Sequence, residues 1–258
     1  MPRVIVIANQ KGGVGKTTTA INLSTCVAER GKKVLLIDID PQGNATSGLN
    51  MSKNEEKSIY DVLVKEEPID NAIRATMVKN LHICPANMDL AGAEVELVSV
   101  ENREMRLKKA IEEMERKYDY IFIDCPPSLG LITLNAFAAA NSVLVPIQCE
   151  YYALEGLGQL VNTIKLIQKG LNEDLEIEGV VLTMYDSRTK LSLQVAGEVK
   201  KYFDTKLFNT VIPRNIRLGE APSYGLPITM YDPFSKGART YKKLAKELLD
   251  KYKGKKGE

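Results

Sequence analysis

A glycine-rich stretch near the start of the chain carries residue types that bind phosphate. Residues 9–18 read NQKGGVGKTT. This sequence nearly fits the phosphate-loop pattern G-x-x-x-x-G-K-[ST], whose glycines let backbone N–H groups approach phosphate oxygens. Gln10 stands where the first glycine is expected, and a second lysine, Lys11, follows it. The stretch therefore predicts a phosphate site with an additional cation.

The second half of this stretch has the residues that a nucleoside triphosphate requires. Lys16 would neutralise the β and γ phosphates, and the Thr17 hydroxyl would bind Mg²⁺. Backbone N–H groups at the start of the following helix add further donors. The alternative interpretation is a glycine-rich turn without a ligand. The predicted ATP-binding residues here are Gly12, Gly13, Val14, Gly15, Lys16, Thr17 and Thr18.

Acidic residues close two other apolar runs and suit metal-dependent hydrolysis. Asp124 ends the run YIFID and would hold Mg²⁺ through water, unless it only caps a loop. Asp38 and Asp40 close a second run, and alternation along a strand places them on the same side. Two carboxylates there can orient a water molecule and serve the shell of the metal, whose charge would offset their repulsion.

Short β-branched runs alternate with helical patterns along most of the chain. These runs are apolar on both faces, as is typical of parallel strands covered by helices on both sides. They are Val4–Ala8, Val34–Asp38, Leu81–Pro85, Tyr120–Asp124, Val143–Ile147, Gly179–Met184 and Thr210–Pro213. The pattern predicts a doubly wound α/β fold with a mostly parallel sheet flanked by helices, and it places the phosphate loop after the first strand.

Amphipathic patterns mark helices between these strands. Such patterns cover Lys16–Arg30, Glu101–Lys117, a segment with apolar residues every fourth position from Leu191 to Phe203, and Ser235–Tyr252. Residues 48–80 are polar and predict an insertion that holds one short helix, capped by Ser58 and Asp61. Because no repeat or linker divides the sequence, we expect one domain over residues 1–258.

Composition favours a globular protein in a reducing compartment. Hydrophobic residues make up 44% of the 258 residues, enough for a large core. The four cysteines lack metal-ligand spacing and are expected to be buried free thiols. Residues 125–149 carry no charge, but prolines and polar residues divide them into a short helix and a strand rather than a membrane span. We expect no signal peptide and a cytoplasmic location.

The formal net charge of +2 is unevenly distributed. Residues 1–186 contain 19 Lys and Arg against 26 Asp and Glu, a net of −7. Residues 187–258 contain 16 against 7, a net of +9. Such asymmetry indicates either an anionic partner for the basic part or simply a solvated, lysine-rich surface.

Five segments together resemble one family of nucleotide-hydrolysing proteins. The resemblance is to the ParA/MinD class of P-loop ATPases, which has a deviant phosphate loop, and within it to chromosome-type ParA, also called Soj. It extends from about residue 3 to about residue 250. The segments are KGGVGKTT at 11–18, DIDPQGN at 38–44, DCPPS at 124–128, QCEYY at 148–152 and PRNIR at 213–217.

The resemblance implies a role for the second lysine and for the acidic residues. Lys11 would reach across an ATP-bound dimer to the phosphates on the partner subunit, whereas the sequence alone favours a surface lysine. Asp40 would position the attacking water, Asp38 would belong to the neighbouring metal-side network, and Asp124 would be the acidic residue on the metal. The catalytic residues implied are Lys11, Lys16 and Asp40.

The resemblance also implies contacts outside the phosphate loop. Pro213 and Asn215 fall in the loop that contacts adenine, and Arg188 and Arg217 match basic positions implicated in DNA binding. ATP with Mg²⁺ would join two subunits, and the dimer would bind double-stranded DNA without sequence preference. Hydrolysis stimulated by a ParB-like protein would release it, so a nucleoid-associated location follows. Both arginines could also be merely solvated.

Four other functions compete with chromosome partitioning. A MinD-like membrane ATPase would end in an amphipathic helix, and the residues 253–258, KGKKGE, have nothing apolar to insert, so no membrane is expected. An electron carrier would need cysteines placed for an iron–sulfur cluster. A tyrosine kinase would need a tyrosine-rich tail. A transcription regulator would need a helix-turn-helix extension, for which only the residues before Asn9 are available.

Overall fold

A sheet of seven strands forms the centre of the part that the computed structural model describes, which is residues 2–150 and 153–253, with side chains except at 153–157. The strand order is β3-β4-β2-β5-β1-β6-β7, and only the pair β3 and β4 is antiparallel. The strands are β1 (Arg3–Ile7), β2 (Val34–Asp38), β3 (Arg74–Ala75), β4 (Leu81–Cys84), β5 (Tyr120–Asp124), β6 (Ser142–Gln148) and β7 (Glu176–Thr183).

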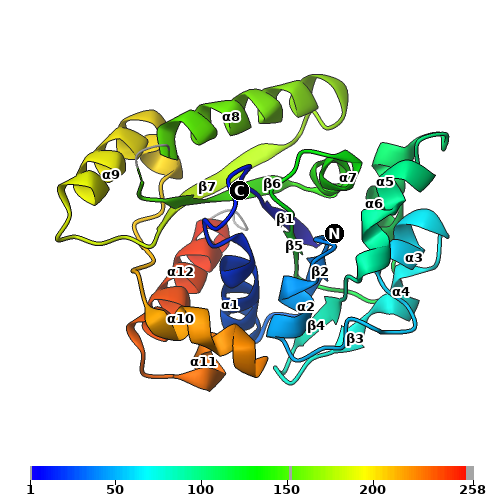
Figure 1. Cartoon of the computed structure of the whole chain (residues 1–258), viewed down its shortest axis with the longest axis horizontal. Coiled ribbons are helices and arrows are strands. Elements are labelled where there is room, and N and C mark those ends of the chain that lie inside the picture. Colours follow the sequence, from blue (N-terminus) through cyan, green and yellow to red (C-terminus); the bar gives the residue numbers. More distant parts are fainter. Residues whose placement is uncertain (1, 151–152, 254–258) are drawn as a thin grey trace.

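Helices cover both faces of this sheet, which confirms the predicted doubly wound α/β fold (Figure 1). The helices are α1 (Lys16–Ala28), α2 (Asn44–Gly48), α3 (Ile59–Val64), α4 (Ile69–Ala72), α5 (Ala93–Glu96), α6 (Arg106–Glu112), α7 (Leu131–Ala139), α8 (Ala153–Gly170), α9 (Lys190–Phe203), α10 (Ile216–Glu220), α11 (Ile228–Tyr231) and α12 (Lys236–Lys253). Short 3₁₀ turns are η1 (Met88–Ala91), η2 (Arg103–Met105), η3 (Asp204–Lys206) and η4 (Ala221–Tyr224).

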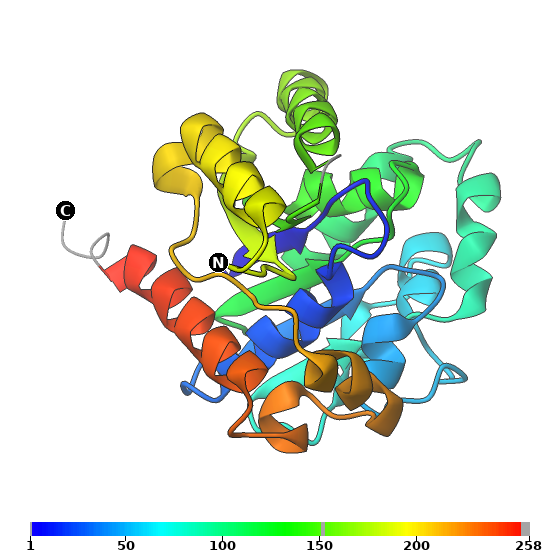
Figure 2. The same cartoon turned by 60° about the vertical axis from the view of Figure 1, so that its left-hand side comes forward.

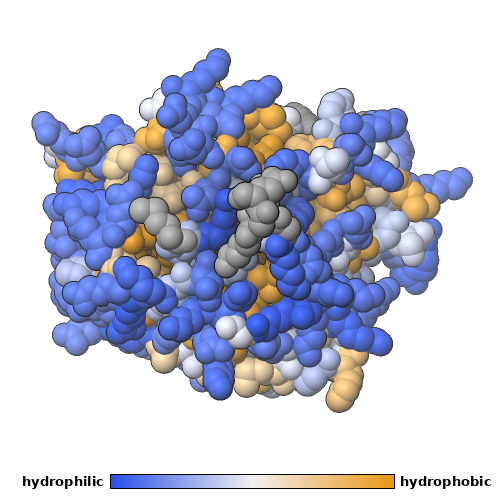
Figure 3. Space-filling view, turned by 180° about the vertical axis from the view of Figure 1, so that it is seen from behind, coloured by the Kyte–Doolittle hydropathy of each residue, from blue (hydrophilic) through white to orange (hydrophobic). Residues whose placement is uncertain are grey.

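Alternate residues of the interior strand β1 face two separate apolar clusters. Val4 and Val6 of β1 pack with residues of α3, α6, α7, α8 and α9. Ile5 and Ile7 pack with residues of α1, α10, α11 and α12. A strand buried on both faces needs apolar residues at every position, which is why its sequence shows no polar alternation. Polar side chains remain outside, and the face seen in Figure 3 is mainly hydrophilic.

The long helix α12 lies along α1 and brings the basic end of the chain onto the sheet (Figure 2). Tyr241, Leu244 and Leu248 of α12 are buried in the same cluster as Leu23 of α1. The Tyr241 hydroxyl also lies 3.2 Å from the Thr19 hydroxyl in the first turns of α1. The helix that starts at the phosphate loop is therefore held by the C-terminal part of the chain.

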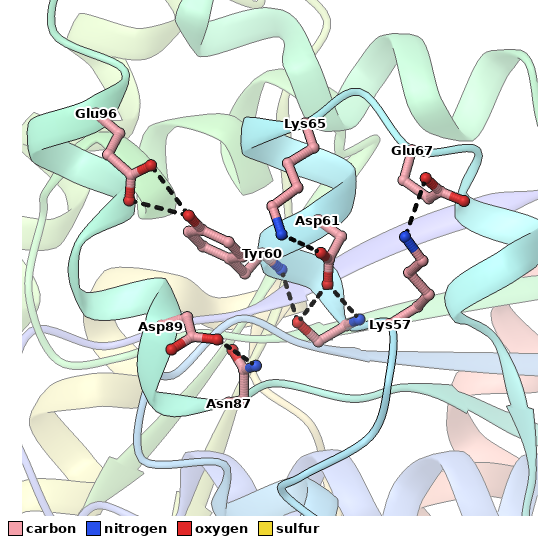
Figure 4. Close-up of polar contacts among 9 residues, drawn as sticks. Lys57, Tyr60, Asp61, Lys65, Glu67, Asn87, Asp89 and Glu96 are labelled. Carbon is pink, nitrogen blue, oxygen red and sulfur yellow. Dashed lines mark hydrogen bonds and ion pairs between the residues drawn. The ribbon is translucent and has the colours of Figure 1, made fainter.

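The polar segment after β2 contains the predicted capping box. The Ser58 hydroxyl accepts a hydrogen bond from the backbone of Tyr60, and the Asp61 carboxylate accepts one from the backbone of Ser58 at 2.9 Å. Figure 4 shows that Lys65 also reaches Asp61, at 2.9 Å, and that the Tyr60 hydroxyl lies against Glu96. These contacts fix α3 against α5, beside the sheet.

Two predicted elements were wrong in extent or kind. The helix predicted over Glu101–Lys117 is only η2 and α6, because the Asp70 carboxylate accepts the backbone N–H groups of Glu115 and Arg116 at 2.8 and 3.2 Å. The strand predicted over Thr210–Pro213 is absent, and only an isolated bridge joins Pro213 to Tyr185. The Glu247 carboxylate accepts a hydrogen bond from the backbone N–H of Thr210, and Pro213 has no backbone N–H to pair with a neighbouring strand.

Helix α8 was not predicted from the sequence, although its apolar residues have helical spacing. Leu160, Ile164 and Ile167 recur at helical spacing and are buried on one face. The segment QCEYY that carried part of the family resemblance lies just before it, and residues 151 and 152 fall outside the described residues.

Candidate nucleotide-binding site

The phosphate loop joins the carboxyl end of β1 to α1, as predicted, and in Figure 2 it is the blue segment that projects beyond the end of the central strands. Gly13 and Gly15 have φ of 74° and 87°, a left-handed conformation that favours glycine. Gly12 does not, and a Cβ added at Gly12 would meet nothing within 4 Å. The protein itself therefore gives no reason for glycine at position 12, whereas a closely approaching ligand would.

The first turn of α1 is not capped by any described side chain. Gly15 is the N-cap residue. The first helical hydrogen bond runs from the Thr19 N–H to the Gly15 carbonyl oxygen, at 2.9 Å. The N–H groups of Lys16, Thr17 and Thr18 precede this bond and are left for another acceptor. An uncapped helix N-terminus behind a glycine-rich loop is suited to an anion.

Two residues that sequence reasoning missed anchor the loop to neighbouring strands. The Asn9 amide donates to the Pro146 carbonyl at 2.8 Å, and its oxygen accepts the Lys11 N–H at 3.0 Å. On the other side, the Thr183 hydroxyl donates to the Val14 carbonyl at 2.8 Å. Only their positions at the ends of strands could have indicated this role. The loop is thus held from β6 and β7 as well as from its own ends.

The two lysines of the loop lie in different surroundings. Lys16 is buried, and its ammonium group donates to the Lys11 carbonyl at 3.1 Å. Burial lowers the pKa of Lys16, and the nearby Asp124 carboxylate opposes that shift. The Lys11 side chain is 35% exposed and pairs with Glu150 at 2.9 Å. Lys16 therefore belongs to the interior of the site, and Lys11 to its surface.

Asp124 and Asp38 lie side by side beneath the loop. They are register partners on β5 and β2, and both are fully buried. Burial raises the pKa of Asp124 well above its ordinary value, and the charge of Asp38 adds to the rise. Neither Asp124 oxygen has a hydrogen-bond partner of normal geometry among the described residues, although the Thr17 hydroxyl is near enough to lower the pKa partly. An orphaned buried carboxylate beside a hydroxyl fits a cation.

The oxygens of Asp38, in contrast, are already occupied by protein donors. One accepts the N–H and hydroxyl of Thr46, both at 2.8 Å, and the other accepts the Asp40 N–H at 3.1 Å. Burial nevertheless raises the pKa of Asp38 to about 6. Asp40 follows the end of β2, is buried with an exposed fraction of 9%, and accepts the Gln42 N–H at 2.9 Å. Asp38 thus positions the turn that carries Asp40.

No group of three His, Cys, Asp or Glu side chains within the described ranges is arranged to hold a metal ion. Mg²⁺ at such sites usually takes one or two carboxylates together with substrate phosphates and water. The Thr17 hydroxyl and the Asp124 carboxylate are the described residues with this chemistry next to the phosphate loop.

A small cavity of about 170 Å³ adjoins the start of α1 and contains both residues predicted to contact adenine. Its wall is formed by Gly15, Thr18, Thr183, Met184, Ile212, Pro213, Arg214, Asn215, Leu218, Gly219 and Tyr241. The Asn215 side-chain oxygen accepts the Arg217 N–H at 2.9 Å and so caps α10. Its amide NH₂ remains available for a ligand in the cavity.

The two predicted DNA-binding arginines are exposed, and both are paired with carboxylates. Arg188 makes two hydrogen bonds to Asp186, at 2.9 and 2.7 Å, and its side chain is 87% exposed. Arg217 pairs with Glu220 at 2.9 Å. Sequence reasoning did not single out Arg214. Its charge lowers the pKa of Asp186, although less than Arg188 does. The backbone N–H of Arg214 lies 3.4 Å from the Tyr185 carbonyl. The segments that carry all three arginines are therefore neighbours.

The described helices include none that is both long and apolar enough to cross a membrane. A parallel sheet with a glycine-rich loop between β1 and α1, and a buried aspartate at the end of the adjacent strand β5, defines a P-loop nucleotide-binding protein. The family profile described as AAA domain matches residues 2–177 of the chain.

Known proteins of similar sequence extend this classification. The chain is 61% identical to the sporulation initiation inhibitor protein Soj of Bacillus subtilis over 249 residues, covering 96% of this chain and 98% of that protein. It is 54% identical to the chromosome-partitioning ATPase Soj of Treponema pallidum, with the same coverage. The chain belongs to the Soj/ParA family of chromosome-partitioning ATPases.

Solved structures agree with the fold. A cobyrinic acid a,c-diamide synthase from Mycobacterium smegmatis, with bound ADP and magnesium, has a TM-score of 0.86 and 38% identity, covering 99% of this chain and 97% of that one. The septum site-determining protein MinD of Pyrococcus horikoshii, with Mg-ADP, has a TM-score of 0.81 and 29% identity over the full length of both chains. Both are less similar in sequence than the Soj proteins.

Proposed function

We propose that this ATPase is a nucleotide-dependent switch that dimerises with ATP, binds DNA without sequence preference, and drives chromosome or plasmid partitioning. One observation carries the proposal: the two loop lysines are separated, with Lys16 buried beside Asp124 and Lys11 near the surface. A single nucleotide site needs only the inner lysine. The outer lysine would serve the nucleotide of a second subunit.

The residues within one subunit suit ATP with Mg²⁺. Lys16 and the backbone from Gly12 to Thr18 would hold the phosphates, and Pro213 and Asn215 would hold the base in the adjoining cavity. Thr17 and Asp124 would hold the metal, Asp124 through water, and Asp38 would support them. Mg²⁺ would supply charge neutralisation of the phosphate oxygens. Asp40 would orient the attacking water, because its carboxylate is close enough to Asp124 and Lys16 to influence the pKa of both.

The proposed dimer uses Lys11 in trans. Among the described side chains, Glu150 is the one that holds its ammonium group, in an ion pair with both side chains a third or more exposed. Pairs of this kind contribute about 0–1 kcal/mol, so leaving Glu150 for a triphosphate costs little. Charge-assisted contacts to a phosphate of the partner subunit's nucleotide are stronger. ATP would therefore link the two subunits, and hydrolysis would separate them.

DNA binding would use Arg188 and Arg217 and the basic part of the chain, whose net charge is +9 over residues 187–258. Arg188 would exchange the half-buried Asp186, and Arg217 would exchange Glu220 and Asp232, for a DNA phosphate. Such contacts carry no sequence information. Two subunits double the number of phosphate contacts, so ATP-dependent dimerisation strengthens binding through effective concentration.

A ParB-like activator would complete the cycle by stimulating hydrolysis, and the protein would then be cytoplasmic and nucleoid-associated. The MinD-like alternative has support in the similar fold of a MinD structure. The higher identity to Soj proteins favours partitioning. The tail on which the membrane argument depended, at residues 254–258, lies outside the described residues.

A binding titration tests the switch. Duplex DNA of two unrelated sequences is titrated with protein in ADP, in ATP and in a non-hydrolysable analogue, at two salt concentrations. We expect tight binding only with the analogue or ATP, equal for both sequences and much weaker at high salt. Equal DNA affinity with ADP and with ATP would contradict the proposed switch. Binding to anionic vesicles but not to DNA supports the MinD-like alternative.

A further inference from the structure

A second cavity, lined by basic residues, lies at the opposite end of the sheet from the phosphate loop. Its volume is about 630 Å³, within the range of ligand sites. Arg3 begins β1 and Tyr120 begins β5, whereas the phosphate loop follows the other end of β1. In Figure 2 the C-terminal end of α12 (red), which forms one wall, lies far from the blue loop. The cavity therefore belongs to no part of the nucleotide site.

Basic side chains outnumber acidic ones around this cavity. The charged lining residues are Arg3, Arg30, Lys32, Lys246 and Lys253, against Asp119 and Asp250. Both acidic residues already have partners: Asp119 accepts the Lys33 N–H at 2.8 Å, and Asp250 pairs with Lys253 at 2.7 Å. Lys32 and Lys246 pair with no described carboxylate. The cavity thus keeps uncompensated positive charge.

Two lining residues also have buried polar atoms without a hydrogen-bond partner of normal geometry among the described residues. One is the Arg3 Nε, although another nitrogen of the same guanidinium reaches Glu178 at 3.3 Å. The other is the Tyr118 hydroxyl. Burial raises the pKa of Tyr118, and only the Arg116 guanidinium opposes the rise; because that group is itself a donor, the phenolic proton remains free. Buried donors without acceptors are costly and call for one.

Basic residues at the C-terminal ends of α1 and α12 also offset the helix dipoles there. That effect accounts for the positions of Arg30 and Lys253, which follow or end those helices. It does not account for the orphaned Nε on β1 or for the Tyr118 hydroxyl before β5. The guanidinium of Arg3 is a donor, so an acceptor of negative charge would satisfy it together with the free lysines.

We propose that this cavity binds a small phosphate-bearing anion of the pyrophosphate or nucleotide class, remote from the catalytic site. The partly exposed guanidinium of Arg3 would donate hydrogen bonds from the cavity wall. Lys32 and Lys246 would neutralise the phosphate charge from its rim. The Tyr252 ring, which is partly exposed beside Tyr120 at a centroid distance of 6.4 Å, offers an aromatic surface in the same cavity.

Calorimetric titration of inorganic pyrophosphate into the full-length Lys16→Ala variant tests the site at low salt, because that substitution disables the phosphate loop. We expect saturable binding to one site. Adding Lys32→Gln and Lys246→Gln should weaken it about five- to tenfold, since two ion pairs are lost. The control pair Lys79→Gln and Lys169→Gln removes the same charge from exposed lysines outside the cavity and should leave binding unchanged.

Absence of saturable binding in Lys16→Ala would overturn the proposal, and so would equal weakening by the two double variants. A duplex DNA titration is the third arm. If the cavity variants weaken DNA binding but leave pyrophosphate affinity unchanged, the surface is a DNA contact and the small-anion site is rejected. The variants at Lys32 and Lys246 change side chains that make no described ion pair, so their folding should be preserved.

Discussion

Asp38 and Asp124 are register partners at the carboxyl ends of the adjacent strands β2 and β5, and both are fully buried. Two carboxyl groups so placed cannot easily carry charge together, and the pKa of each is raised mainly by burial. Asp38 is held by three protein donors, whereas Asp124 has no normal hydrogen bond among the described residues. The pair therefore combines a carboxylate that is fixed by the protein with one that is available to a ligand.

The first prediction concerns stability and pH. A carboxyl whose pKa is raised in the folded state binds protons more tightly there, so stability falls as pH rises. For Asp38 the fall extends from about pH 4 to about pH 6, and Asp124 continues it to higher pH. Asp124→Asn, which removes the charge, should stabilise the nucleotide-free protein at pH 7.5 by about 1–3 kcal/mol and flatten its pH dependence. Urea denaturation at pH 5 and 7.5 measures both effects.

The control for this substitution is Asp174→Asn, the same chemical change at an exposed position. It should alter stability by less than about 0.5 kcal/mol at either pH. Asp124→Asn should also abolish Mg²⁺-dependent ATP hydrolysis. An Asp124→Asn protein that is less stable at pH 7.5 than the unmodified protein would show that the buried carboxylate has a partner that we have not identified.

The second prediction is that Lys16→Ala lowers the affinity for ATP by at least about two orders of magnitude, so that no binding is detected at micromolar ATP. Lys16 is the buried lysine of the loop, and within the described residues its ammonium group has only the Lys11 carbonyl as a hydrogen-bond partner. Isothermal titration calorimetry with ATP and Mg²⁺ measures the effect. An unchanged affinity for ATP would show that Lys16 does not contact the nucleotide.

The third prediction separates the two lysines. Lys11→Ala should bind ATP within about threefold of the unmodified protein, because the exposed pair with Glu150 contributes little to the fold. It should fail to form the ATP-dependent dimer. Light scattering after size exclusion with a non-hydrolysable analogue gives the mass. If Lys11→Ala forms an ATP-dependent dimer as stable as that of the unmodified protein, Lys11 contributes only to the surface charge.

The fourth prediction is that Asp40→Ala forms an ATP-bound dimer that persists. The substitution removes the carboxylate proposed to orient water while leaving the phosphate loop intact, so hydrolysis should fall by about 10²- to 10⁴-fold. Size exclusion with ATP, followed over hours, distinguishes this variant from the unmodified protein. A monomer in the presence of ATP would instead mean that Asp40 helps to hold the subunits together.

The fifth prediction is that Arg217→Glu weakens binding to every duplex about equally and reduces the salt slope, while ATPase activity survives. The reason is that Arg217 would contact phosphates and not base edges. Fluorescence anisotropy with two duplexes measures it. Arg116→Glu is the matched control, since Arg116 is also an exposed arginine near a carboxylate but belongs to the acidic part of the chain. Loss confined to one sequence would indicate a base contact.

Local sequence was sufficient for much of the fold and for the centre of the site. Six strands, the phosphate loop and the Ser58 capping box follow from patterns of a few residues, because burial on both faces and glycine conformation leave local signatures. Predictions failed where distant side chains decided the backbone. The Asp70 carboxylate shortens the helix after Asn102, and Glu247 replaces a strand partner at Thr210.

The sequence by itself determined which residues could bind a nucleotide: Lys16, Thr17 and Asp124 carry that chemistry in types and spacing alone. Only the tertiary structure decided that Asp124 is left without a normal partner and that Asn9 and Thr183 anchor the loop. It also brought Arg3 and Lys246 to one cavity. The physical reason is that hydrogen bonds, desolvation and charge depend on neighbours in space, and those neighbours lie more than a hundred residues apart in the chain.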